Sequence, residues 1–169
     1  MNEPADPNHA DIDPGDYRRV LGHFPTGVTV VTAETSEGPI GVAIGSFASI
    51  SMDPPLVGFF LGTSSNSGAG IESAGHFCVN ILAAEQLELC GVMASKSDTK
   101  FEGVDVTPAP ATGAPVLPGV HAMIDCSLEQ VVELGDHNLI VGRVQHLHAD
   151  VEGETVPMVF HKGQYGTFG

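Results

Sequence analysis

The stretch Ile40–Leu61, IGVAIGSFASISMDPPLVGFFL, decides the fold, because it holds two apolar runs of strand length on either side of two prolines. Proline cannot donate to the interior of a sheet, so the pair breaks the chain. Leu56–Leu61 after the break predicts a short buried strand. Ile40–Ile50 before it predicts another strand, whose Gly41 and Gly45 mark either a barrel corner or a place where a flat ligand lies against the main chain.

Further runs rich in β-branched residues lie on both sides of this stretch and predict more strands. They are Val28–Thr32, Phe77–Leu82, Val120–Leu134, Asn138–His148 and Val156–Phe160. Three short helices are expected: one that begins at the cap residue Asp13 and ends before Pro25, one near Ile71–Ala74 and one over Ala84–Ala94. About seven strands with no alternating strand-helix-strand rhythm predict an antiparallel barrel in an all-β-dominated chain with short helices.

The charge of the chain excludes several classes of partner. Six Lys+Arg against 21 Asp+Glu give a net charge of −15. A surface this acidic argues against nucleic acid and anionic membranes. No apolar run reaches the roughly 20 residues of a membrane helix, and the start lacks the basic and apolar regions of a signal peptide. We therefore expect a cytoplasmic protein, with a flexible acidic tail over residues 1–14 and one domain over residues 15–169.

The metal-binding residue types occur in patterns that do not predict a metal site. Cys78, Cys90 and Cys126 are far apart and odd in number, which favours reduced, buried thiols. His146 and His148 share one face of a strand, but no third ligand is evident nearby, so we expect both to be exposed.

Several catalytic signatures are absent or weak. The sequence has no G-x-G-x-x-G after a strand, no P-loop lysine motif and no G-x-S-x-G nucleophile elbow. Ser97–Lys100 matches S-x-x-K but has no companion motif, which favours a chance match.

Three polar segments are candidates for a ligand site, each with a simpler alternative. Thr63–Gly68 offers hydroxyls and free backbone N–H groups to a phosphate, or is only a surface loop. Gly135-Asp136-His137 is a hairpin turn or places an imidazole beside a cofactor. Phe160–Gly163 could hold a nicotinamide nucleotide, or is an ordinary end of a strand.

Together, these segments resemble the flavin reductase-like, FMN-binding split-barrel family. Leu21–Thr32 is similar to the start of that family's domain, Gly45–Val57 to its "SF-S-S-PPLV" block, and Gly75–Leu82 to its "G-F-VN-L" strand. Four shorter pieces follow in the family's order: Lys100-Phe101, Gly113–Pro115, Gly135–His137 and Phe160–Tyr165. The resemblance covers Tyr17–Phe168, which is nearly the whole chain.

The resemblance implies a Greek-key split β-barrel and a homodimer with flavin near the subunit interface. It implies hydride transfer from NADH or NADPH to FMN or FAD, and a possible transient partner monooxygenase that receives the reduced flavin. It places His137 near the nicotinamide as the catalytic-site residue, with no metal. The implied cofactor-binding residues are Thr26, Ala43, Ile44, Gly45, Ser46, Phe47, Ser49, Ser64, Ser65, Asn66, Ser67, Phe101, Phe160, His161, Lys162 and Gly163.

The chain departs from many relatives at positions that hold the flavin. Thr and Asn are common in the family where this chain has Ala43 and Gly45, and an Arg or Trp is common in the loop that here carries Asn66, Gly68 and Ala69. Flavin contacts through backbone and serine hydroxyls are therefore expected. Two rivals remain: a non-enzymatic flavin-binding protein on the same barrel, and an oxidase of the pyridoxamine-phosphate kind, which the small number of cations disfavours.

Overall fold

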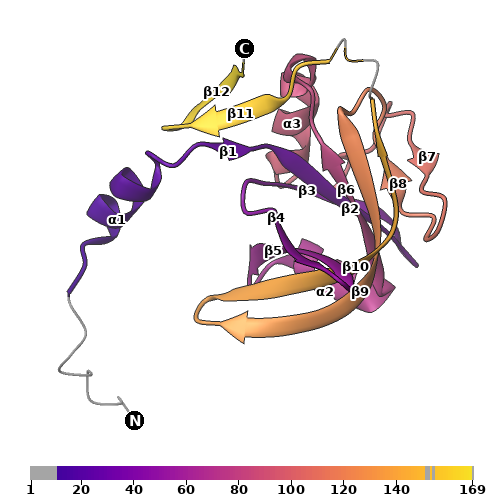
Figure 1. Cartoon of the computed structure of the whole chain (residues 1–169), viewed down its shortest axis with the longest axis horizontal. Coiled ribbons are helices and arrows are strands. Elements are labelled where there is room, and N and C mark those ends of the chain that lie inside the picture. The colour runs from indigo at the N-terminus through magenta and orange to yellow at the C-terminus, as the bar shows by residue number, and fades with distance from the viewer. Residues whose placement is uncertain (1–10, 151–152, 154, 169) are drawn as a thin grey trace.

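A computed structural model describes residues 11–150, 153 and 155–168 (Figure 1). Seven strands form one antiparallel sheet in the order β3-β2-β6-β9-β10-β5-β4. They are β2 (Thr29–Thr35), β3 (Gly38–Ile44), β4 (Ala48–Met52), β5 (Pro55–Gly62), β6 (His76–Ile81), β9 (Ala122–Leu134) and β10 (His137–Ala149). The two edge strands, β3 and β4, follow each other in the chain, so the sheet curls into a barrel that is split between them. The expected antiparallel barrel is confirmed.

Two smaller sheets lie beside the barrel. β1 (Thr26–Gly27), β11 (Met158–His161) and β12 (Gln164–Thr167) form a three-stranded sheet in the order β1-β11-β12. Residues 107–118 form a proline-rich segment. Within it, β7 (Thr107–Pro108) pairs with β8 (Pro115–Val116). The C-terminal strands thereby lie against the start of the barrel, far from them in the sequence (Figure 1).

The helices are short, and side chains cap the starts of α1 and α2. α1 (Pro14–Leu21) follows Asp13, whose carboxylate accepts hydrogen bonds from the N–H groups of Gly15 and Asp16. α2 (Asn66–Ala74) follows Ser65 and packs against the barrel; α3 (Leu87–Ala94) follows a 3₁₀ turn, η1 (Ala84–Gln86), and packs against β3. No described helix is both long and apolar enough to cross a bilayer.

The structure differs from the sequence-based expectations in several places. The single strand expected over Ile40–Ile50 is two strands, β3 and β4, because the chain bends at Gly45–Phe47. α2 begins at Asn66, inside a stretch expected to be a loop, because the Ser65 hydroxyl accepts from the Gly68 N–H, 3.2 Å away, and caps the helix. The short strands β1, β7, β8 and β12 were not expected. Residues 1–10 of the expected acidic tail lie outside the described residues.

The barrel core depends on a close approach of β10 to aromatic side chains. Phe59 and Phe77 are fully buried and pack edge to face with ring centroids 5.2 Å apart. Gly142 lies against this pair: a Cβ at this position would lie 2.3 Å from the Phe77 ring. Glycine is therefore the residue that lets β10 pass over the ring.

Two buried polar side chains fix the proline-rich segment to the barrel. The Asn80 side-chain oxygen accepts from the Leu117 N–H at 2.9 Å. The Asp125 carboxylate accepts from the N–H groups of Ala111 and Thr112, at 2.7 and 3.1 Å, and from the Thr112 hydroxyl. Buried polar groups with partners of this kind hold a loop in one conformation, so the segment is ordered against the barrel.

Candidate functional site

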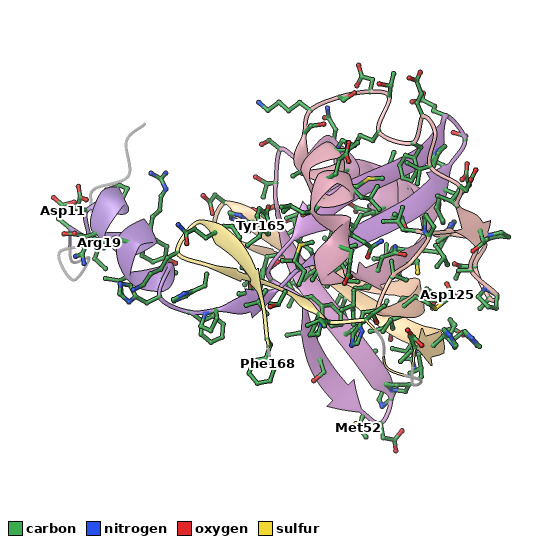
Figure 2. All side chains as sticks on the ribbon, turned by 90° about the horizontal axis from the view of Figure 1, so that it is seen from above. Asp11, Arg19, Met52, Asp125, Tyr165 and Phe168 are labelled. Atoms are coloured by element: carbon green, nitrogen blue, oxygen red, sulfur yellow. The ribbon has the colours of Figure 1, made fainter. Side chains whose placement is uncertain are left out.

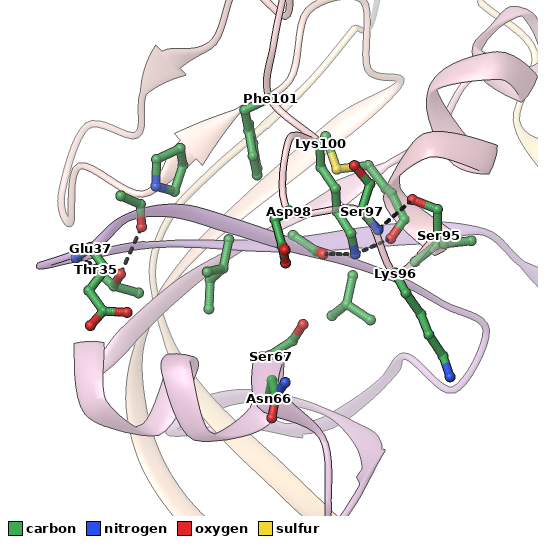
Figure 3. Close-up of a pocket in the computed structure, with 18 of the residues that line it drawn as sticks. Thr35, Glu37, Asn66, Ser67, Ser95, Lys96, Ser97, Asp98, Lys100 and Phe101 are labelled. Carbon is green, nitrogen blue, oxygen red and sulfur yellow. Dashed lines mark hydrogen bonds between the residues drawn. The ribbon is translucent and has the colours of Figure 1, made fainter.

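A cavity of the described chain lies between β3, the N-terminus of α2 and the segment after α3 (Figure 3). Its volume is about 720 Å³, within the range of small-molecule and cofactor sites. We call it the large cavity. It is lined by Thr35, Glu37, Gly38, Pro39, Ile40, Gly41, Val42, Ala43, Ser64, Asn66, Ser67, Met93, Ala94, Ser95, Lys96, Ser97, Asp98, Lys100 and Phe101.

A second, mostly apolar cavity of about 150 Å³ adjoins it, which we call the small cavity. It is lined by Val28, Ala43, Ile44, Gly45, Cys90, Ala94, Phe160 and Tyr165. Ala43 and Ala94 line both cavities, so the two meet at the end of β3. An apolar cavity of this size accommodates one six-membered aromatic ring.

The side chains of Ser64, Asn66 and Ser67 form one wall of the large cavity, which we call the 64–67 wall. Asn66 and Ser67 lie at the start of α2 and point into the cavity (Figure 3). The first N–H groups of a helix lack partners within the helix, and its dipole favours negative charge at that end. This wall therefore offers polar groups to a phosphate without a cation.

The opposite wall is fastened by a lysine. The Lys100 ammonium donates to the carbonyl oxygens of Gly41 on β3 and Met93 on α3, both at 2.9 Å (Figure 3). Burial lowers the pKa of Lys100. A Cβ on Gly41 would lie 2.8 Å from the Met93 sulfur and 3.1 Å from the Phe101 ring. A glycine at position 41 therefore allows this wall to close against β3.

Gly45 and Thr26 approach each other closely at the rim of the small cavity. A Cβ on Gly45 would lie 2.8 Å from the Thr26 hydroxyl oxygen. That oxygen is buried and has no hydrogen-bond partner among the described residues. Glycine at position 45 therefore allows the Thr26 side chain to pack against the end of β3.

Among the residues expected to contact the cofactor, Ser46, Phe47 and Ser49 line neither cavity. The Ser46 hydroxyl donates to the Phe60 carbonyl at 3.2 Å and accepts from the Phe60 N–H at 3.0 Å, which joins the β3–β4 bend to β5. Phe47 packs against the barrel core. Ser49 is exposed on β4.

His137 begins β10 at the tip of the β9–β10 hairpin, outside the lining of both cavities. Its Nδ1 lies 2.7 Å from the Asp136 carboxylate, and this hydrogen bond lowers the pKa of Asp136. The Thr63 N–H donates to the Asp136 carbonyl at 3.0 Å. The turn is therefore joined to the beginning of the 63–68 loop.

The C-terminal segment contributes two residues to the small cavity. They are Phe160 and Tyr165, whose ring centroids lie 5.0 Å apart. His161 ends β11. The turn to β12 is formed by Lys162 and Gly163, whose φ angles are 49° and 77°. The Lys162 N–H donates to the Gly22 carbonyl at 3.0 Å.

Sequence reasoning missed several residues of the cavities. Glu37, Lys96, Asp98 and Lys100 line the large cavity, and Tyr165 lines the small one. The Lys100-Phe101 pair was recognised as a motif, but only the Phe was assigned to the site. The other residues lie in segments whose approach to β3 depends on the fold of the whole chain.

An antiparallel split barrel with such a cavity beside a Ser/Asn-rich helix start defines a class of proteins suited to phosphorylated, ring-containing ligands. Residues 21–169 match the model of the flavin reductase-like domain. The chain belongs to this family, so the family expected from the sequence is confirmed.

Three relatives show how similar the chain is to known proteins. It is 47% identical over 158 residues to a flavin reductase of Pseudomonas putida, covering 93% of this chain and 91% of the relative. It is 47% identical over 154 residues to the reductase subunit of a flavin-dependent monooxygenase of Rhodococcus jostii, covering 91% and 77%. An NADH:FAD oxidoreductase of Streptomyces globisporus, solved with NAD and FAD fragments, matches with a TM-score of 0.86 and 33% identity, covering 95% and 98%.

Proposed function

We propose that this chain transfers hydride from NADH or NADPH to FMN or FAD and supplies the reduced flavin to a partner monooxygenase. The observation that carries the proposal is the large cavity between the 64–67 wall and β3, in a chain of the flavin reductase-like family. The wall offers phosphate ligands, and the junction with the small cavity offers a place for a ring beside Ala43–Gly45.

The residues present fit a flavin. Ser64, Asn66 and Ser67 would hold the phosphate, Phe101 would contact the chain that joins phosphate and ring, and the backbone of Ala43–Gly45 would receive the isoalloxazine. Thr26, which packs against Gly45, would support this part of β3.

The cofactors supply the redox chemistry, with nicotinamide as hydride donor and flavin as acceptor. The chain supplies proximity, orientation and exclusion of water. His137 would orient the nicotinamide. Asp136 is an acceptor only, because its low pKa keeps it ionised, so His137 Nδ1 donates to it. In the neutral imidazole, Nε2 is then free to accept a hydrogen bond from a carboxamide N–H.

We further propose that the chain acts as a homodimer. α1 has no buried residue, and its side chains Tyr17, Val20 and Leu21 are each more than half exposed. Both views show this helix projecting away from the barrel (Figure 1, Figure 2). An apolar stripe of this kind, left exposed by the part of the chain that the structure describes, favours a contact with a second copy.

We also propose that the protein works in the cytoplasm. Its three cysteines are free and buried, which suits a reducing compartment.

The test is oxidation of NADH and NADPH by the purified full-length chain with added riboflavin, FMN or FAD. We expect flavin-dependent turnover with at least one pairing, followed by release of reduced flavin that a separate oxygen-consuming monooxygenase can use. Tight flavin binding without stimulated oxidation of either nicotinamide nucleotide would instead support the non-enzymatic flavin-binding alternative.

A further inference from the structure

The large cavity is longer than a flavin mononucleotide placed as above requires. Its β3 wall runs from Gly38 to Ala43, which spans roughly 17 Å at the usual rise of a strand. A ring at Ala43–Gly45 leaves the ribityl phosphate to follow this wall. Seven bonds from ring to phosphorus cover about 8 Å, at roughly 1.2 Å per bond of an extended chain. About half of the wall lies beyond the phosphate.

The far half of the cavity has a different lining from the phosphate wall. It is formed by the turn between β2 and β3 and by the beginning of β3. Glu37 in the turn offers a carboxylate, and Pro39 and Ile40 on β3 offer apolar surface. Figure 3 places Glu37 and Thr35 together at the end of the cavity opposite Lys96. A carboxylate there repels a phosphate and accepts hydrogen bonds from neutral hydroxyl groups.

Two cations line the large cavity, although cations are scarce in this chain. The chain has six Lys+Arg and a net charge of −15. Arg19 pairs with Asp16 and Arg143 with Glu129, yet Lys96 and Lys100 both line the large cavity. The cavity also contains the carboxylates of Asp98 and Glu37, so its lining is balanced in charge within a strongly acidic chain. A balanced lining lowers the repulsion that a dinucleotide otherwise meets.

We propose that the large cavity selects FAD over FMN, with the pyrophosphate between the 64–67 wall and Lys96 and the adenosine at the β2–β3 turn. This inference rests on the proposed function and deepens it. The Glu37 carboxylate accepts hydrogen bonds from the ribose hydroxyls of the adenosine. An acidic residue has this role in other dinucleotide sites. Pro39 and Ile40 pack against the adenine.

The test measures equilibrium binding of riboflavin, FMN and FAD to the full-length chain by quenching of flavin fluorescence, with no nicotinamide nucleotide present. We expect FAD to bind at least about five times more tightly than FMN, because the adenosine adds contacts that FMN lacks. Equal affinities for FMN and FAD would overturn the inference.

Glu37→Gln isolates the adenosine end. A lost hydrogen bond to a charged group corresponds to about a tenfold change in affinity, so we expect the Kd for FAD to rise about tenfold and that for FMN to stay unchanged. Glu34→Gln is the matched control, since Glu34 is exposed on the same hairpin but does not line the cavity. An equal loss for FMN and FAD in Glu37→Gln would contradict the assignment.

Lys96→Gln isolates the pyrophosphate. We expect the Kd to rise most for FAD, less for FMN and not at all for riboflavin, which has no phosphate and serves as the internal control. A raised KM for NADH or NADPH in Glu37→Gln, with the preference between FAD and FMN kept, would assign the cavity to the nicotinamide dinucleotide instead. Because binding is measured without turnover, failure of the reductase activity and failure of FAD selection give separate results.

Discussion

The Thr26 hydroxyl is a buried polar group that destabilises the folded chain. It has no hydrogen-bond partner among the described residues, and it lies beside Gly45. Leaving such a group without a hydrogen bond costs about 1 to 3 kcal/mol. We predict that Thr26→Val raises the free energy of unfolding of the flavin-free protein by about 1 kcal/mol, because valine keeps a similar shape and removes the unpaired oxygen. Chemical denaturation measures the change. A lower free energy of unfolding in Thr26→Val would contradict the prediction.

His137 is predicted to position the nicotinamide without transferring a proton. His137→Ala should raise the KM for NADH or NADPH about tenfold and change kcat little, because one orienting hydrogen bond is lost. Asp136→Asn, which removes the charge of its partner, should give a smaller change in the same direction. Steady-state kinetics at saturating flavin measure both. Loss of kcat in His137→Ala with the KM unchanged would contradict a positioning role.

Cys78 and Cys126 make the stability of the barrel depend on alkaline pH. Burial raises the pKa of each thiol from 9.0 to about 12. A raised pKa in the folded state means that the protonated thiols contribute stability in full below about pH 9, which is lost as pH rises toward 12. We predict that the free energy of unfolding falls by about 1 to 3 kcal/mol per pH unit in that window. Urea unfolding measures it, and Cys78→Ala/Cys126→Ala should flatten the slope; an unchanged slope would contradict the prediction.

At the scale of elements, α1 is a helix whose apolar side chains are not covered by the described residues. We predict that Val20→Gln/Leu21→Gln converts a dimer into a monomer in light scattering, because both apolar side chains are exposed on the subunit. Arg18→Gln/Arg19→Gln is the matched control on the polar side of the helix and should leave the mass unchanged. A wild-type chain that is monomeric at high concentration would contradict the proposed homodimer.

The strands and helices differ in how well the sequence alone predicts them. Strands with strong β-branched runs, such as β2 and β6, and the capped start of α1 at Asp13 were predictable because their signals are local. The division of Ile40–Ile50 into β3 and β4 was not, because the bend is fixed by the Ser46 hydroxyl against Phe60, 14 residues along the chain. The large cavity was equally hidden, since Lys100 reaches β3 across 59 residues of sequence.

At the scale of the whole molecule, the acidic charge and the anionic cofactors are in conflict. A net charge of −15 repels NADH and flavin nucleotides at long range, while Lys96 and Lys100 act only inside the large cavity. The Debye length is about 30 Å at 0.01 M salt and about 8 Å at 0.15 M. Added salt therefore screens the distant carboxylates while leaving the partly buried Lys100 in place.

Because the repulsion acts at long range and the two lysines act only inside the large cavity, we expect added salt to speed the reaction with NADH. We predict that kcat/KM for NADH rises about two- to fivefold as potassium chloride increases from about 0.01 to about 0.15 M, because screening removes long-range repulsion from the encounter. Binding of riboflavin, which is uncharged, should not change over the same range and is the control. Stopped-flow reduction of flavin at each salt concentration measures the effect. If the rate constant instead falls with salt, the cations of the large cavity govern the approach of NADH, and the net charge of the chain does not.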